Sequence, residues 1–209
     1  MSKGDDTRDL VLTQAGGLMN RTGYRATSMS SILEAVGLQK GGFYNHFPSK
    51  DALALEAFQA NAEVLGAHLG SLAKAHGDPA VVLKNLLDAS VDVAQGKILP
   101  GGCPVLNAGI EADDTWEPLR EAAARSADAL RRYFLLALHR LERAGRLKPG
   151  TPVEDFATLF VAATEGGILW SRVTKDTPGQ RALLELLWSL FETHLREAPD
   201  SSPMKRRDS

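Results

Sequence analysis

Residues 37–53 read GLQKGGFYNHFPSKDAL, and two adjacent glycines, Gly41 and Gly42, interrupt what the surrounding pattern predicts to be a short helix. Each glycine destabilises a helix interior by about 1 kcal/mol relative to alanine. A lysine, a tyrosine, a histidine and a second lysine surround the pair, and all four side chains can meet an anion. A helix weakened among such donors indicates a segment shaped by function rather than by stability.

The apolar spacing around this stretch predicts helices at about 7–21, 27–36 and 39–46. Gly37 breaks the second helix, and Pro48 ends the third because the residue before a proline is pushed out of the helical region. Two short helices joined by a glycine turn describe a helix-turn-helix, whose second helix enters the major groove of DNA. A loop with a solvated basic edge explains the stretch about equally well when it is taken alone.

The side chains of this motif divide by face. Phe43 and Phe47 are four residues apart and are expected to anchor the third helix in a small core. Gln39 is the best candidate base reader because its amide can pair with adenine, whereas His46 and Lys50 are expected to donate to phosphates. The candidate DNA-contacting residues are Thr27, Ser28, Gln39, Lys40, Gly41, Gly42, Tyr44, Asn45, His46 and Lys50.

Residues 23–58, GYRATSMSSILEAVGLQKGGFYNHFPSKDALALEAF, closely resemble the N-terminal domain of the tetracycline-repressor (TetR/AcrR) family. The family pattern has a G-[YF]-x-x-T-[ST] start, an A-x-G-[VL] turn and a K-G-x-[FL]-Y-x-H-F-x-[ST]-K-[DE]-x-L segment, and every fixed position is met here. The resemblance implies an all-helical homodimer joined through the last two helices. It also implies a DNA-binding regulator, usually a repressor that a small-molecule effector releases from a pseudo-palindromic operator.

The rest of the chain repeats the helical pattern, so about nine helices and an all-α fold are expected. Residues 1–50 are expected to form the helix-turn-helix domain, called the head below, and residues 51–198 the ligand-binding and dimerisation domain, called the body. Residues 199–209 are polar and are expected to be disordered. The further helices are expected at about 49–75, 79–95, 103–112, 115–144, 152–174 and 178–196.

The composition is that of a soluble globular protein, with 209 residues, 44% hydrophobic and 24% charged. One cysteine excludes an internal disulfide, no apolar run approaches the length of a membrane span, and no signal peptide is recognisable, so a cytoplasmic location is expected. The head carries a net charge of +2 and the remainder −4, which is compatible with a nucleic-acid-binding head.

Enzyme signatures are missing from the sequence. There is no i, i+4 histidine pair for a metal, no phosphate-binding glycine loop and no G-x-S-x-G elbow, so no catalytic residue, metal or cofactor is expected. No sequence motif supports a hydrolase that uses Cys103 and His139. Two alternatives to an operator-binding regulator remain, a helical ligand-binding protein and a cysteine-dependent enzyme, neither of which would bind an operator.

Residues 101–124, GGCPVLNAGIEADDTWEPLREAAA, resemble the C-terminal domain of the LmrA/YxaF-like branch of the family, where G-C-P or G-C-L precedes [NS]-x-[AG]-x-E. Pro104 suits the first position of a helix and places Cys103 at its N-cap, where a thiolate would be stabilised. Some relatives are known to sense electrophiles or oxidants with a cysteine in this region. Cys103 is therefore either such a switch or a small buried residue lining a pocket, and most free cysteines are of the second kind.

The inward stripes of the body helices supply further pocket candidates, although each is also explained as plain core. Glu111, Asp113, Asp114 and Glu117 could attract a cationic ligand, or the aspartates could cap the next helix. Gly166 and Gly167 indicate close helix packing, expected at the dimer interface against leucines and a phenylalanine of the last helix, Leu183, Leu187, Leu190 and Phe191. The ligand-binding or sensing candidates are Cys103, Leu106, Asn107, Trp116, Phe134 and Trp170, with Phe58 and Leu86 on the same stripes.

Overall fold

The computed structural model describes residues 3–196, and this part of the chain contains nine helices and no strand. The predicted all-α fold is confirmed. The last expected segment, 199–209, lies outside the described residues. No helix in the described part is long and apolar enough to cross a membrane. The helices are α1 (Lys3–Thr22), α2 (Met29–Val36), α3 (Lys40–Tyr44), α4 (Lys50–Ala73), α5 (Pro79–Ala94), α6 (Pro104–Ala112), α7 (Glu117–Arg143), α8 (Val153–Thr174) and α9 (Thr177–Glu192).

Several helix boundaries differ from the expected ones, most of them by one or two residues. Helix α1 begins four residues earlier than the pattern suggested, and α3 has only five residues, because its C-terminal cap at Asn45 turns the chain toward Phe47. Helix α9 ends at Glu192 because the chain then forms a short antiparallel bridge between Leu147 and Leu195. The bridge ties the loop before α8 to the end of α9.

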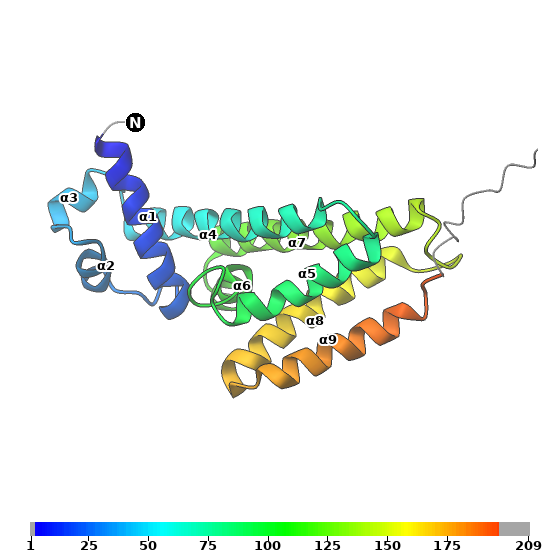
Figure 1. The fold of residues 1–209 in the computed structure, drawn as a ribbon. Helices are drawn as coiled ribbons and strands as arrows, with labels where there is room; N and C mark the ends of the chain where they lie inside the picture. The colour runs from blue at the N-terminus through cyan, green and yellow to red at the C-terminus, as the bar shows by residue number, and fades with distance from the viewer. Residues whose placement is uncertain (1–2, 197–209) are drawn as a thin grey trace, which may run out of the picture.

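The nine helices form an elongated molecule with the head at one end (Figure 1). Helix α4 leaves the head and runs along the body beside α7, while α8 and α9 form the side of the body away from α4. The short helix α6 lies where the head meets the body and contacts α1, α4 and α7. Helices α4 and α6 therefore join the body to the head.

The core of the head extends past residue 50. Tyr24, Phe43, Phe47 and Phe58 are fully buried in one hydrophobic cluster, and Tyr24 and Phe58 meet edge to face at 5.7 Å between ring centroids. The same cluster includes residues of α6 and α7 from the body, Ala108, Ala112, Leu119, Ala122 and Ala123. The division at residue 50 remains a prediction, but the apolar packing is continuous across it.

The core of the body lies between α5, α7, α8 and α9, around the rings of Phe134, Phe156, Phe160 and Phe191. Part of the expected interface packing is internal to the subunit. Gly167 packs against Gln180 and Leu183 of the same chain, and Leu187 and Phe191 are buried in this core. Close helix approach at Gly167 therefore joins α8 to α9 rather than one subunit to another.

Candidate nucleic-acid interface and ligand cavity

The helix-turn-helix has the local geometry that its sequence predicts. Ser28 caps α2 by accepting a hydrogen bond from the Ser31 N–H at 3.1 Å, and Gly37 ends α2 in the left-handed conformation with φ +66°. Phe43 and Phe47 are buried with their ring centroids 5.6 Å apart. These two rings fix α3 on the head, as expected, and leave its other side to solvent.

The outward side of the turn and α3 carries donors and no bulky obstacle. Gln39, Lys40 and Asn45 are exposed, Tyr44 is 46% exposed, and His46 is partly buried. An added Cβ atom at Gly41 would meet nothing within 4 Å, and one at Gly42 would meet only Leu38 at 3.9 Å. Since the protein itself does not need glycine at either position, the observed space favours the close approach of an external partner.

The structure gives Thr27 and Lys50 hydrogen-bond partners within the protein. Thr27 is only 4% exposed, and its hydroxyl donates to the Gly23 carbonyl. The Lys50 ammonium donates to the carbonyls of Arg25, at 2.6 Å, and Thr27, at 3.1 Å. Both side chains bond within the protein, so they support the turn between α1 and α2.

Glu111 of α6 holds the same turn from its other side. Its Oε2 atom accepts a hydrogen bond from the Tyr24 N–H at 2.6 Å, and its Oε1 atom accepts from the N–H groups of Arg25, at 2.8 Å, and Ala26, at 3.2 Å. Lys50 binds the carbonyls of the turn while Glu111 binds its amides. The turn that precedes α2 is thus clamped between the first residue of α4 and the last turn of α6.

Asn107 and Trp116, which were expected in a pocket, lie at this junction between head and body, where Asn107 lines an open depression of about 390 Å³. The Asn107 amide donates to the Asn20 carbonyl at 2.9 Å and to the Gly101 carbonyl at 3.0 Å. Trp116 is partly buried under the guanidinium of Arg25, 5.6 Å from its ring centroid. An added Cβ at Gly101 would lie 2.5 Å from the Asn20 oxygen, so only glycine permits this close approach.

A small cavity of about 30 Å³, called the inner cavity, lies between α4, α5, α7 and α8. Cys103 and Phe134 line it, as expected, and Leu106 packs beside it. Trp170 lies elsewhere: it is 54% exposed, and its indole donates to Asp176 Oδ2 at 3.2 Å. The walls are formed by Leu65, Leu69, Leu86, Ser90, Val93, Cys103, Leu130, Tyr133, Phe134, Val161, Thr164, Glu165 and Ile168.

Cys103 and Glu165 are in direct contact in the wall of the inner cavity. The Cys103 thiol donates to Glu165 Oε1 at 3.1 Å. Burial raises the pKa of Cys103 well above its ordinary value, and the charge of Glu165 raises it further; the N–H groups of Leu106 and Val105 at the start of α6 lower it by less. The helix N-terminus does act on the thiol, but desolvation wins, so Cys103 stays protonated and is a poor nucleophile.

Burial also raises the pKa of Glu165, to about 7. The residue as a whole is partly buried, but its carboxyl group is enclosed, and Oε2 is buried without a hydrogen-bond partner among the described residues. Sequence reasoning missed Glu165. The available signal was a single charge inside the otherwise apolar run VAATEGGILW of α8.

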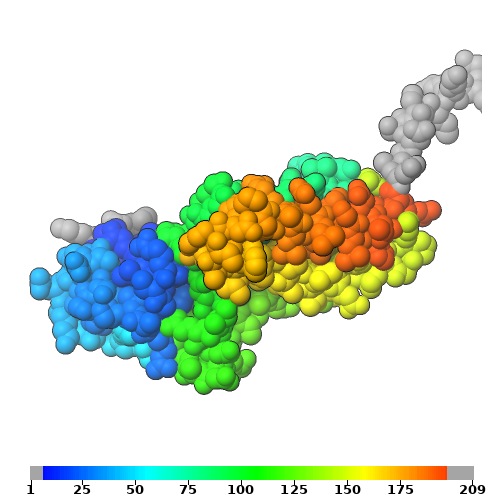
Figure 2. Space-filling model, turned by 90° about the horizontal axis from the view of Figure 1, so that it is seen from below, coloured from blue at the N-terminus to red at the C-terminus, as the bar shows by residue number. Residues whose placement is uncertain are grey.

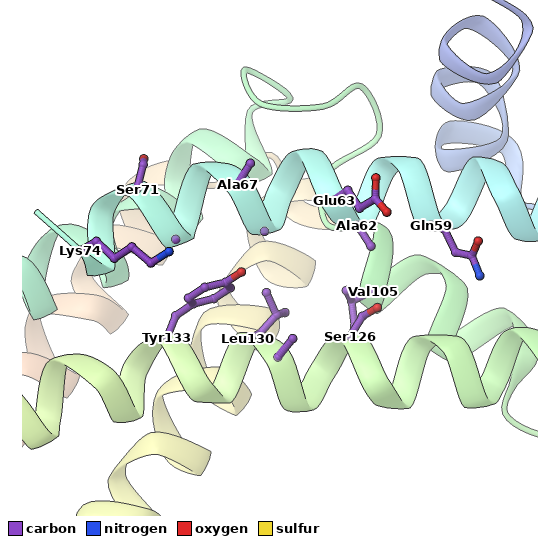
Figure 3. Close-up of a pocket in the computed structure, with 13 residues that line it drawn as sticks. Gln59, Ala62, Glu63, Ala67, Ser71, Lys74, Val105, Ser126, Leu130 and Tyr133 are labelled. Carbon is purple, nitrogen blue, oxygen red and sulfur yellow. The ribbon is translucent and has the colours of Figure 1, made fainter. Parts of the chain in front are cut away.

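A larger open depression, called the outer groove, lies between α4 and α7 and has a volume of about 700 Å³ (Figure 3). Tyr133 projects from α7 toward α4 in this view. Added Cβ atoms at Gly66 and Gly70 would lie 3.1 and 3.3 Å from the Tyr133 side chain, so these glycines make room for it. Tyr133 and Leu130 line the inner cavity as well, and they therefore separate the two spaces.

The acidic residues that follow α6 do not form one cation site. Asp113, Asp114 and Glu117 are exposed, whereas Glu111 is bonded to the head. Among the residues that the structure describes, no group of three or more histidine, cysteine, aspartate or glutamate side chains is arranged to hold a metal ion.

A helix-turn-helix head on a helical body that contains a cavity defines a class of one-chain DNA-binding regulators. Two family models match the chain: "Bacterial regulatory proteins, tetR family" over residues 11–57 and "Tetracyclin repressor-like, C-terminal domain" over residues 79–186. The chain belongs to the TetR family of bacterial regulatory proteins. The family resemblance read from the sequence is confirmed.

Individual relatives agree with this assignment. The chain is 30% identical to the HTH-type transcriptional regulator LmrA of Bacillus subtilis over 179 residues, which cover 85% of this chain and 92% of LmrA. The crystal structure of a TetR transcriptional regulator from Chloroflexus aurantiacus superposes with a TM-score of 0.88 at 33% identity, covering 94% and 99% of the two chains. The regulator CifR, in a cysteine mutant complexed with 26-base-pair operator DNA, shares the fold, with a TM-score of 0.78, 21% identity and coverage of 87% and 94%.

Proposed function

We propose that the protein is a homodimeric repressor that binds a pseudo-palindromic operator through its turn and α3 and is released by a small molecule bound in the body. The exposed face formed by Gln39, Lys40, Tyr44 and Asn45 beside two glycines carries this proposal. A helix presented in this way can enter the major groove, with Gln39 at a base edge and Lys40 at a phosphate. The operator complex of CifR, a protein of the same fold, supports it.

The dimer is proposed to form through α8 and α9, which lie together along one face of the body (Figure 2). Exposed apolar side chains gathered on one surface mark interaction sites in soluble proteins. A two-fold dimer would present two α3 helices to half-sites about one helical turn or more apart. The exposed apolar residues of these helices are Leu159, Leu169, Trp170, Val173, Leu183, Leu186 and Leu190.

Release requires that the effector bind the non-DNA state better than the DNA-bound state. The junction supplies a route for this coupling. Cys103 at the start of α6 lines the inner cavity, and Asn107 and Glu111 farther along the same helix bind the head. A ligand that shifts α6 would move the clamp on the α1–α2 turn and with it the spacing of the two heads.

The proposal includes no enzymatic activity and places the protein in the cytoplasm with the chromosome. Burial keeps the Cys103 thiol protonated by raising its pKa, and no histidine lines the inner cavity. His139 is instead paired with Glu142 on the surface, at 3.2 Å between Nδ1 and Oε2. Neither arrangement supports a cysteine-dependent hydrolase.

Gel-shift binding to DNA from immediately upstream of the protein's own coding region, at two salt concentrations, tests the function. We expect sequence-selective binding that weakens with salt. Gln39→Ala should change sequence preference, whereas Lys40→Ala should weaken all sites similarly. Lys84→Ala, an exposed lysine of α5, is the matched control and should change neither. Equal effects of the Gln39 and Lys40 variants on every sequence would contradict the assigned roles.

A further inference from the structure

The body contains a buried carboxyl group that its own chain does not satisfy. Glu165 Oε1 accepts the Cys103 thiol, but Oε2 is buried without a partner among the described residues. Leaving a buried acceptor unpaired destabilises a folded protein, and native structures rarely retain one without a reason. The unpaired oxygen therefore indicates a donor that the chain itself does not supply.

The walls around Glu165 restrict what that donor can be. The inner cavity is mostly apolar, and the rings of Tyr133 and Phe134 line it together with the carboxyl group. Aromatic faces attract cations, and a carboxylate pairs most strongly with a charged donor. A second carboxylate or a phosphate would be repelled. The combination favours a positively charged nitrogen attached to an apolar skeleton.

The inner cavity alone, at about 30 Å³, has no room for such a skeleton, but the outer groove does. At about 700 Å³, the groove falls in the range of small-molecule sites, roughly 300–1,000 Å³. Tyr133 and Leu130 stand between the two spaces, and Gly66 and Gly70 leave α4 without side chains where the Tyr133 ring lies. A rotation of Tyr133 would join groove and cavity.

We propose that the outer groove and the inner cavity are two parts of one binding site, which takes an apolar molecule carrying a protonated amine or amidine and pairs that nitrogen with Glu165. The skeleton lies in the groove against α4 and α7, and the charged end passes Tyr133. This molecule is the class of effector that the proposed function requires, so the site rests on that proposal, but its binding is measured without DNA.

Calorimetric titration of the full chain at pH 8 with 2-naphthylmethylamine and its uncharged isostere 2-naphthylmethanol tests the site. The wild type should bind the amine roughly tenfold to a hundredfold more tightly, as one charge-assisted hydrogen bond in a dry site predicts. Glu165→Gln should abolish this preference. Glu63→Gln is the matched control, because Glu63 is an exposed carboxylate that lines the outer groove, and it should keep the preference.

Tyr133→Ala should bind both compounds at least as tightly as the wild type and retain the preference for the amine. Absence of an amine preference in the wild type, or its loss in Glu63→Gln and retention in Glu165→Gln, would overturn the proposal. The regulator function fails separately. Selective amine binding by a protein that binds no operator would uphold the site and contradict the function, and operator binding without amine selectivity would do the reverse.

Discussion

Glu111 and Glu165 are both glutamates of body helices, and they differ in how far the protein satisfies them. The Glu111 carboxylate accepts three backbone N–H groups of the head, so both of its oxygens are bonded. Glu165 accepts one thiol and keeps a buried oxygen unpaired. A carboxylate whose oxygens are both hydrogen-bonded fixes one arrangement of the chain. A carboxylate with an unpaired oxygen can still accept a hydrogen bond from a ligand. The proposals above assign Glu111 to transmitting the effector signal and Glu165 to receiving it.

The largest expected effect follows from removing the fully hydrogen-bonded carboxylate of Glu111. Glu111→Ala leaves three N–H groups of the turn without their acceptor, and we expect a loss of about 3 kcal/mol in the free energy of unfolding, with weaker operator binding. Chemical denaturation measures the first and gel shifts the second. Glu117→Ala removes an exposed glutamate paired with Arg120 and should change neither. If Glu111→Ala had the same free energy of unfolding as the wild type, the hydrogen bonds of Glu111 to the turn would not contribute to stability.

Removing the Glu165 carboxylate, which has an unpaired oxygen, should stabilise the protein instead of destabilising it. Its pKa is 4.5 ordinarily and about 7 in the folded protein, so the folded state holds an extra proton between these values. Stability therefore falls as the pH rises from about 4.5 to 7 and stays lowered above 7. Glu165→Gln lacks this loss. It should be more stable than the wild type by roughly 2 kcal/mol at pH 8 and equal to it near pH 4.5.

Denaturation midpoints of both proteins across this pH range measure the difference. Parallel pH profiles of wild type and Glu165→Gln would contradict the raised pKa of the carboxyl group. Glu63→Gln, with its exposed carboxylate, should follow the wild type.

Two lysines of the head sharpen the same contrast. Lys50 is bonded to two carbonyls, whereas Lys40 is exposed and makes no hydrogen bond or ion pair with any described residue. Lys50→Ala should lower stability by about 1 kcal/mol and leave the salt dependence of operator binding unchanged. Lys40→Ala should leave stability unchanged and reduce the salt slope by about 1. If Lys50→Ala reduced the salt slope and Lys40→Ala did not, Lys50 and not Lys40 would be the residue that contacts DNA.

The smallest effect concerns the thiol beside Glu165. Cys103 should react with iodoacetamide much more slowly in the folded protein than in denaturant, because burial and the neighbouring carboxylate keep it protonated. Glu165→Gln removes the carboxylate but not the burial, so alkylation of the folded variant should speed up by about tenfold at most. Mass spectrometry of timed samples measures the rate. Fast alkylation of the folded wild type would contradict this expectation and support the hypothesis that Cys103 senses electrophiles.

The geometry of the head could be predicted from local patterns because its signals are short-range. Gly37 at the turn, Ser28 and Ser49 as caps and the Phe43–Phe47 anchor all act within a few residues of the chain. The motif identified Thr27 and Lys50 as well, but residue type does not tell which way a side chain bonds. Their partners are carbonyls of the turn itself, which a sequence pattern does not display.

The body resisted prediction because its sites join helices that are distant in sequence. Apolar spacing located every helix, but it did not show which stripe borders the inner cavity, and so Trp170 was included and Tyr133 was not. Asn107 was assigned to a ligand pocket, and the structure places it at the junction between head and body. Its partner, Asn20, lies 87 residues away in the chain, and nothing local announces that contact.

The clamp on the α1–α2 turn also determines where this molecule can be divided for engineering. A chimera that grafts residues 1–50 onto another sensor would leave behind Glu111, Asn107 and the alanines that complete the core of the head. The transplantable unit is discontinuous, residues 7–62 together with 100–123. Hybrid regulators built from this chain should therefore exchange the interior of the body behind α6 and keep both segments from one parent.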